Sequence, residues 1–257
     1  MGRPAGISLV LLSKFSVVLS RILCLLALIV PARAAEIVVA AASDLTALEQ
    51  ALAAAYKTDT RDTVRFAFGS SGMLARQIAN GAPYDVFLSA NQQFVDELVR
   101  SGQIAADSVL WYASGRLALW SRDGSLRSLA QLDAPGILHI SLANPAHAPY
   151  GLAAKQALES RGLWTKLEKK AVYAENVRQA WEYARSGNAD AALTSWTLVY
   201  DKGGVLVPAE WHQPIRQTGG VVKASAHPGE ARKFLAFLRS AQGREVLRRF
   251  GLFPPGP

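Results

Sequence analysis

The segment from Glu36 to Tyr56 has the sequence EIVVAAASDLTALEQALAAAY. Its first part, Ile37 to Ala42, is a short apolar run typical of a strand, and Leu45 to Tyr56 carries apolar residues at helical spacing. Ser43 stands between the two and belongs to the residue types that cap helix N-termini. The segment therefore predicts a strand, a tight junction and a helix, which is the repeating unit of an α/β fold.

The same order of elements recurs along the chain. Strand-like Thr63 to Phe68 is followed by Gly-Ser-Ser-Gly and a helix from Met73 to Asn80, and strand-like Tyr84 to Ser89 is followed by a helix from Asn91 to Ser101. We expect later strands at residues 116–120, 138–142, 171–174, 189–194 and 219–223, and later helices at residues 151–161, 177–186, 228–240 and 242–250. Alternation of this kind predicts mainly parallel sheets flanked by helices. Because no Pro/Gly/Ser linker divides the chain, we expect two lobes with a ligand cleft between them.

The first 34 residues have the pattern of a secretory signal peptide. Arg3 and Lys14 precede the apolar run Ile22 to Val30, which is too short to cross a bilayer and ends in the small residues of PARAA. We expect cleavage after Ala34 or Ala35 and export to the periplasm. The single cysteine, Cys24, lies inside this segment, so the mature chain has no thiol for a disulfide or a metal site.

Composition favours a folded, non-nucleic-acid-binding protein. The 257 residues are 50% apolar and 19% charged, which is enough apolar sequence for a core. The formal net charge is +8, but four of the basic residues lie in the first 34 positions, where there is no acidic residue. The remaining charge is small and forms no dense basic block, so we expect no nucleic-acid partner.

Two strand-to-helix junctions carry residues suited to holding an anion. Ser43 follows the first strand, and Ser70 and Ser71 follow the second within Gly-Ser-Ser-Gly. The N–H groups at a helix start are unpaired and lie at the positive end of the helix dipole, and serine adds an O–H donor. The alternative is that these serines only cap their own helices. Two junctions of this type favour an oxyanion site.

Other chemistries are less well supported. A serine hydrolase built on Ser71 or Ser43 is conceivable, but Met73 stands where a nucleophile elbow requires its last glycine, and none of the four histidines has an acidic residue in a triad-like context. We expect no role for His147 in anion binding. The sequence has no metal-binding H-E-x-x-H motif, no phosphate-binding loop and no dinucleotide fingerprint.

Five segments, taken together, resemble a known family. They are AAASDLT at 40–46, FGSSGMLARQI at 68–78, GAPYDVFLSAN at 81–91, NPAHAPYGLAAK at 144–155 and ENVR at 175–178. The chain resembles the periplasmic molybdate-binding proteins of bacterial ABC transporters, over about Glu36 to Phe253. This resemblance implies the two-lobed fold of type II periplasmic binding proteins, with two hinge crossings. It implies a signal peptide at 1–34, lobe I at 35–115 plus 219–257, and lobe II at 116–218.

The resemblance also implies the site. A tetrahedral molybdate or tungstate anion would be held by Ser43 and Ser71 from lobe I, by main-chain N–H groups of Tyr150 and Val177 from lobe II, and by Ser195. Asn176 would cap the helix that begins at Val177. Ser195 stands where close relatives carry a tyrosine, so its reach is shorter. Asp44 is unusual beside an anion, and we expect it to point away, toward the start of the following helix, because a carboxylate facing a dianion repels it.

These observations predict an exported, non-enzymatic solute-binding protein that takes molybdate or tungstate to a membrane permease. We expect a monomer that needs no cofactor and no metal cation. Two alternatives stay open: a two-lobed receptor for another small anion, such as an organic acid, and a serine hydrolase that uses Ser71.

Overall fold

The computed structural model describes residue 2 and residues 34–255, and residues 35–257 form one compact unit. The predicted signal peptide lies almost wholly outside the described residues. No helix within the described part is both long and apolar enough to span a membrane.

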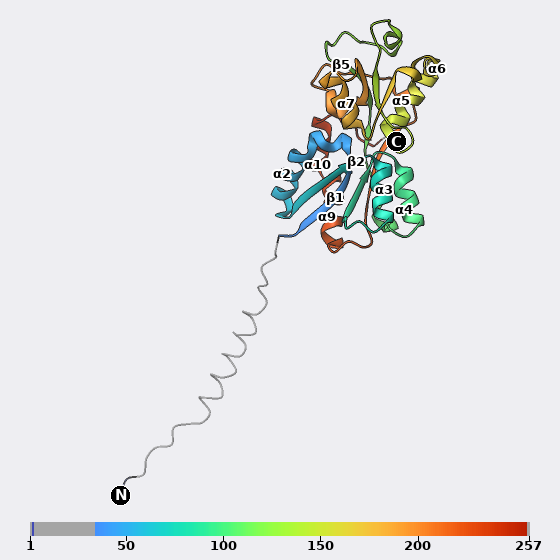
Figure 1. Ribbon diagram of the computed structural model, residues 1–257. Helices are drawn as coiled ribbons and strands as arrows, with labels where there is room; N and C mark the ends of the chain where they lie inside the picture. The colour runs from blue at the N-terminus through green and yellow to red at the C-terminus, as the bar shows by residue number, and fades with distance from the viewer. Residues whose placement is uncertain (1, 3–33, 256–257) are drawn as a thin grey trace. The chain divides into compact units, whose positions relative to one another are not determined.

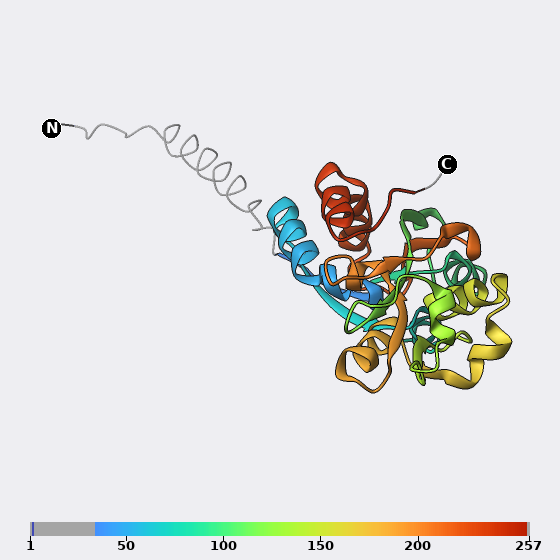
Figure 2. The ribbon, with the colours of Figure 1, turned by 90° about the horizontal axis from the view of Figure 1, so that it is seen from above.

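The unit contains two five-stranded sheets (Figures 1 and 2). The first sheet has the order β2-β1-β3-β10-β4 and consists of β1 (Glu36–Ala42), β2 (Thr63–Gly69), β3 (Val86–Ser89), β4 (Leu110–Gly115) and β10 (Ile215–Val221). The second has the order β7-β6-β8-β5-β9 and consists of β5 (Leu117–Ser121), β6 (Ile140–Ala143), β7 (Ala171–Ala174), β8 (Ala191–Ser195) and β9 (Val205–Leu206). We refer to the elements around the first sheet as lobe I and to those around the second as lobe II.

Helices cover both faces of the first sheet, and the alternating directions of its side chains explain why β1 is apolar from Ile37 to Ala42. Val39 and Ala41 pack toward α2 (Glu49–Thr60), α9 (Pro228–Arg239) and α10 (Ala241–Arg249), whereas Ala40 packs toward α3 (Ser71–Ala79) and α4 (Gln92–Arg100). Figure 1 shows α2 on one side of the sheet with α3 and α4 on the other, and Figure 2 shows the red C-terminal helices beside the blue α2. Both faces of this strand are therefore buried.

Lobe II has its own core. Its longer helices are α5 (Pro149–Ser160) and α7 (Val177–Ser186), which pack on the strands β6 and β8, and its short helices are α6 (Trp164–Leu167) and α8 (Trp196–Val199). Across both lobes, short 3-10 turns lie at Ser43–Leu48, Ala106–Ser108, Leu129–Asp133, Glu168–Lys170 and Ala209–Trp211. The apolar residues of this lobe form the largest buried cluster, with alanines of α5 against β6 and β8. Each lobe therefore buries a core of its own.

Strand pairing in both sheets is mixed, which differs from the expected mainly parallel arrangement. β1 pairs in parallel with β2 and β3, and β6 pairs in parallel with β7 and β8, as the strand–helix–strand units require. β10 and β5 pair antiparallel with their neighbours. The chain leaves the first sheet after β4, enters the second with β5, and returns to the first with β10. The two strands that follow these crossings, β5 and β10, are therefore antiparallel to the strands beside them.

Two local elements differ from their predictions. The residues after β1 form a 3-10 turn at Ser43–Leu48 before α2 begins at Glu49, and Ala42, not Ser43, holds the cap position of that turn. The strand expected at 219–223 starts at Ile215, because Gln217 and Thr218 are buried in it although they interrupt the apolar pattern. The predicted lobe boundary at 218/219 falls inside this strand and stays a prediction.

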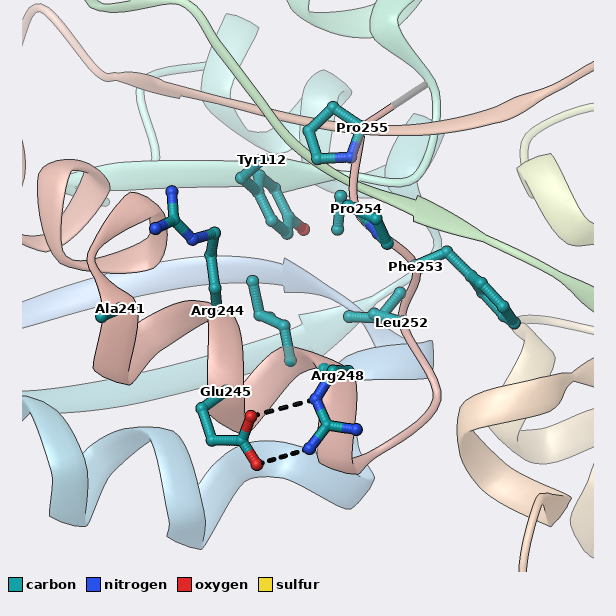
Figure 3. Close-up of a pocket in the computed structure, with 11 residues that line it drawn as sticks. Tyr112, Ala241, Arg244, Glu245, Arg248, Leu252, Phe253, Pro254 and Pro255 are labelled. Atoms are coloured by element: carbon teal, nitrogen blue, oxygen red, sulfur yellow. Dashed lines mark hydrogen bonds and ion pairs between the residues drawn. The ribbon is translucent and has the colours of Figure 1, made fainter. Parts of the chain in front are cut away.

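The C-terminal segment returns to the first sheet. The backbone of Phe253 exchanges hydrogen bonds with that of Ser114 in β4, at 2.8 and 3.0 Å. Figure 3 shows this segment forming one wall of a hollow of about 360 Å³, with α10 opposite and Tyr112 at its base.

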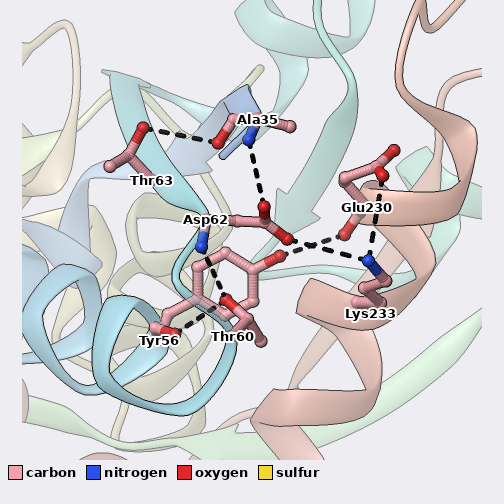
Figure 4. A network of polar contacts seen from close by, with 7 residues as sticks. All are labelled: Ala35, Tyr56, Thr60, Asp62, Thr63, Glu230 and Lys233. Carbon is pink, nitrogen blue, oxygen red and sulfur yellow. Dashed lines mark hydrogen bonds and ion pairs between the residues drawn. The ribbon is translucent and has the colours of Figure 1, made fainter. Parts of the chain in front are cut away.

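The start of the compact unit is held by polar contacts that Figure 4 shows. The N–H of Ala35 donates to Asp62 Oδ1 at 3.0 Å, and its carbonyl accepts from the Thr63 hydroxyl at 3.5 Å, as Figure 4 shows. The same carbonyl also accepts from the Thr63 N–H at 2.8 Å. Lys233 of α9 lies 3.8 Å from Asp62 Oδ2 and from Glu230, and Tyr56 donates to the Glu230 carbonyl. These contacts fix Ala35 next to the N-terminal end of β1, which is an inner strand of the first sheet.

The contact between α5 and β6 generates a prediction about two glycines. A Cβ on Gly151, in the first turn of α5, would overlap the carbonyl of Ala143, whereas a Cβ on Gly229, in the first turn of α9, would meet nothing within 4 Å. We expect Gly151→Ala to lower the free energy of unfolding by about 1 to 3 kcal/mol, because α5 must move away from the sheet. Gly229→Ala is the matched control and should leave stability equal or slightly higher. Urea unfolding of both variants measures this, and equal stabilities would contradict the packing described.

Candidate functional site

A small hollow lies where the two lobes meet. It is formed by the residues that follow β1 and β2, by the residue after β3, and by the starts of α5 and α7. Its walls are Ala42, Ser43, Asp44, Gly69, Ser70, Ser71, Ala90, Ala148, Pro149, Tyr150 and Val177. The free space is about 10 Å³, close to one water-sized position. A hollow of this size suits a small solute rather than an extended organic molecule.

Three helix N-termini meet at the hollow. α3 begins at Ser71, α5 at Pro149 and α7 at Val177, and all three residues line it. The N–H groups of a first helical turn have no partner within the helix and lie at the positive end of its dipole. The predicted cap of α7 is confirmed: the Asn176 side chain accepts from the N–H of Gln179 at 3.1 Å. The hollow can therefore attract an anion with neutral donors.

The serines at the hollow do not cap their helices, which removes the alternative considered from the sequence. Ser70 holds the cap position of α3, but its side chain makes no capping hydrogen bond. Among the described residues, the Ser43 hydroxyl has no hydrogen-bond partner. The Ser71 Oγ accepts from the N–H of Ala90 at 3.0 Å, which leaves its own proton free to donate. Ser43 and Ser71 can both direct an O–H group to a solute.

The structure brings four of the five predicted site residues together. Ser43, Ser71, Tyr150 and Val177 all line the hollow, whereas Ser195 does not. Ser195 is fully buried at the end of β8, and its Oγ bonds to Thr197 Oγ1 at 2.8 Å and caps α8. That capping position follows from the helix that begins directly after the strand, and it turns the hydroxyl toward α8.

The orientation expected for Asp44 is wrong. Asp44 is one of the residues that line the hollow, and its buried carboxyl does not bond to the start of the following helix: Oδ2 accepts from Gln217 Nε2 at 2.6 Å and from the Tyr150 hydroxyl at 3.1 Å. Oδ1 is buried and has no hydrogen-bond partner. Burial raises the pKa of Asp44 to about 7, and the bonds from Tyr150 and Gln217 offset part of that rise. At neutral pH this carboxyl is therefore protonated in a large fraction of molecules.

Asp44 is the centre of a polar cluster that sequence reasoning missed. Tyr112 of β4 donates to Gln217 Oε1 at 3.1 Å, and Thr197 of α8 donates to the Asp44 carbonyl at 2.7 Å. Burial raises the pKa values of the Tyr112 and Tyr150 hydroxyls well above their ordinary range, and the nearby Asp44 carboxyl adds to the rise. Both tyrosines are therefore neutral donors. We call Asp44, Tyr112, Tyr150, Thr197 and Gln217 the hinge cluster.

His147, for which no role in anion binding was expected, contacts Ser70 at the rim of the hollow. Its Nδ1 lies 2.9 Å from Ser70 Oγ, and its carbonyl accepts from the N–H of Gly72 at 2.9 Å. These two bonds join the start of α3 in lobe I to the loop before α5 in lobe II. The pair is formed by Ser70 rather than Ser71, and no carboxylate among the described residues bonds to the His147 ring. The contact ties the lobes together and does not form a catalytic triad.

The larger hollow beside α10 is chemically different (Figure 3). Its walls include Leu247, Leu252, Phe253 and two prolines. Arg248 is engaged by Glu245 through two hydrogen bonds of 2.8 and 3.0 Å, which the figure shows as dashed lines. Its lining is mainly apolar, with Arg244 and Arg248 as its cationic side chains. The part of the chain that the structure describes holds no cluster of three His, Cys or acidic residues that could bind a metal ion.

Two α/β lobes that present helix N-termini and hydroxyls to one small hollow define a receptor for a small solute. Over residues 37–253 the chain matches the bacterial extracellular solute-binding proteins, and it belongs to that family.

Individual relatives agree with this assignment. The chain is 34% identical to the molybdate-binding protein ModA of Rhodobacter capsulatus over 233 residues, covering 87% of this chain and 90% of the relative. The periplasmic molybdate-binding protein of Azotobacter vinelandii superposes with a TM-score of 0.82 at 30% identity, covering 86% of this chain and 100% of that one. The sulfate-binding protein SubI of Mycobacterium tuberculosis shares the fold with a TM-score of 0.73 at 18% identity, over 87% and 88% of the two chains. These comparisons confirm the expected two-lobed α/β fold.

The buried Asp44 carboxyl generates a prediction about stability and pH. Its pKa is near 4 in an unfolded chain and about 7 in the fold, so the native state binds more protons and loses stability as pH rises between these values. The loss amounts to at most about 4 kcal/mol. We expect Asp44→Asn, which keeps the shape without the charge, to remove this loss. Urea unfolding of both proteins at about pH 4.5, 6 and 8 measures it, and a constant difference between the two across this range would contradict the assignment.

Proposed function

We propose that this protein captures molybdate or tungstate in the hollow between the lobes and delivers it to the permease of an ABC importer. The observation that carries the proposal is the meeting of three helix N-termini with the free hydroxyls of Ser43 and Ser71 at one small hollow between the lobes. The names of the relatives from Rhodobacter and Azotobacter support molybdate as the ligand.

The donors divide between the lobes. Lobe I contributes the hydroxyls and N–H groups of Ser43 and Ser71, and lobe II contributes the first-turn N–H groups of Tyr150 and Val177. Hydrogen bonds to a charged acceptor contribute about 1.5 to 3 kcal/mol each, so a few such donors bind an oxyanion without a cationic side chain. Ser195 becomes the fifth donor only if its hydroxyl turns away from Thr197.

Binding of the anion by both lobes also suggests how the permease recognises the loaded protein. An anion that bonds to both lobes stabilises the arrangement in which they are close together. We propose that the chain crosses between the lobes after β4 and again at β10, close to the expected boundaries at 115/116 and 218/219. A closed pair of lobes presents one surface to a permease, and it distinguishes the loaded protein from the empty one.

The remaining parts of the proposal follow from the same features. The family consists of solute-binding proteins, and the hollow shows a Ser–His contact without a carboxylate, so we propose a carrier and not an enzyme. The names of the relatives and the signal-like residues 1–34 support export to the periplasm. We propose that the carrier acts as a monomer, requires no cofactor and binds no nucleic acid.

Substitution of the hollow's serines tests the proposal. We expect Ser43→Ala to weaken molybdate binding by about 1 to 3 kcal/mol, or about 5- to 150-fold in Kd, because one donor to the anion is lost. Stability should change little, since the Ser43 hydroxyl has no partner among the described residues. Ser71→Ala should weaken binding similarly and also lower stability, because the N–H of Ala90 loses its acceptor.

Isothermal titration calorimetry with molybdate measures both effects, and urea unfolding measures the stabilities. Ser101→Ala is the control, because that hydroxyl bonds to the Glu97 carbonyl at the exposed end of α4. Its Kd should equal that of the unmodified protein. Unchanged Kd values for both Ser43→Ala and Ser71→Ala would overturn the proposed site.

A further inference from the structure

The Asp44 carboxyl combines three features that conflict with a simple anion site. It belongs to a residue that lines the hollow, it is completely buried, and its oxygen Oδ1 has no hydrogen-bond partner. Its other oxygen accepts only from neutral groups, the amide of Gln217 and the hydroxyl of Tyr150. A buried carboxylate normally requires a cation or several donors to each oxygen.

The groups packed around Asp44 supply no positive charge. β10 contributes Gln217, α5 contributes Tyr150, β4 contributes Tyr112 behind Gln217, and α8 contributes Thr197. The imidazole at the rim, His147, bonds to Ser70 on the other side of the hollow and not to Asp44. Among the described residues, no lysine, arginine or histidine forms an ion pair or hydrogen bond with this carboxyl.

An oxyanion in the hollow makes the conflict sharper. A dianion and an ionised Asp44 carboxylate would lie against the same small space, with low dielectric around them and strong mutual repulsion. The conflict disappears when the carboxyl carries a proton. The protonated group is neutral, and a neutral carboxyl is buried at a much lower cost than a carboxylate that lacks a cation.

We propose that the hollow binds its oxyanion together with one proton, which is held on the Asp44 carboxyl. This inference rests on the proposed function and assigns Asp44 as a residue that determines the charge the site accepts. The proton comes from solvent, and no covalent bond of the anion is broken. Because Asp44 is then neutral, the occupied site carries only the charge of the anion.

The proposal has a defined signature in pH. In the empty protein the Asp44 carboxyl has a pKa of about 7, so at higher pH it must take up a proton when the anion binds. Molybdate stays fully ionised throughout the neutral and alkaline range, so the ligand itself contributes no proton. The Kd should therefore be nearly constant below about pH 7 and rise by up to about tenfold for each pH unit above it.

Calorimetric titration of the exported protein with sodium molybdate tests this. At about pH 8, titrations in buffers of different ionisation enthalpy should report the uptake of nearly one proton per molybdate bound. The same titrations from about pH 6 to about pH 9 should give the predicted rise in Kd. Asp44→Asn, which has an N–H donor in place of the O–H, should bind with a Kd that does not change with pH and without proton uptake.

A second variant separates Asp44 from the nearest imidazole. His147→Gln should keep the proton uptake and the pH dependence of the unmodified protein. Loss of both in His147→Gln but not in Asp44→Asn would overturn the proposal, as would tight molybdate binding by the unmodified protein with no proton uptake at about pH 8. Absence of molybdate binding at every pH would instead overturn the proposed function. The buffer series on the unmodified protein tests the inference even if Asp44→Asn does not fold.

Discussion

The hydrogen bonds that Asp44 accepts from Gln217 and Tyr150 are the constraint on which the rest of the site depends. Gln217 belongs to β10 in lobe I and Tyr150 to α5 in lobe II, so one buried carboxyl joins strand β10, the 3-10 turn after β1 and the first turn of α5. Thr197 adds α8 by donating to the carbonyl of the same residue. Because each of these groups is buried, loss of one leaves others without a partner, at a cost comparable to a whole hydrogen bond. The cluster therefore holds the serines and helix starts at one place.

This arrangement explains how a site without a cation can select for charge. Helix N-termini and hydroxyls attract an anion, and they do so from fixed positions that need little reorganisation. The carboxyl opposes that attraction unless it is neutral, so the site combines attraction of the anion with a limit on the total charge. The fold supplies both parts, because parallel strands end at the same edge of each sheet and the following helices all begin there. The fold supplies that framework, and in our proposal Asp44 adds the proton.

Local sequence patterns predicted most of the framework and part of the site. The alternation of apolar runs and helical segments identified β1, β2, α3 and α7: β1 is apolar because both of its faces are buried, and α3 and α7 carry their buried residues at helical spacing. Ser71 could be placed because it lies at a strand-to-helix junction, whereas Val177 was assigned to the site only through the resemblance to the molybdate-binding proteins. Gln217 could not, because a polar residue inside a strand gives no sign of a partner 173 positions away. The orientation of Asp44 and the contact of His147 with Ser70 likewise depend on residues of the other lobe, and the displacement of Ser195 depends on the cap of α8.

The position of the anion is the most direct test of the central claim. A crystal structure of the protein grown with molybdate, with diffraction recorded at the molybdenum absorption edge, locates the metal atom without assumptions about the surrounding residues. The account predicts one anomalous peak between Ser43, Ser71, Tyr150 and Val177, within hydrogen-bond reach of donors from both lobes through the oxygens of the anion. A peak confined to another place, such as the hollow beside Arg244 and Tyr112, or crystals with no peak between the lobes, would contradict it.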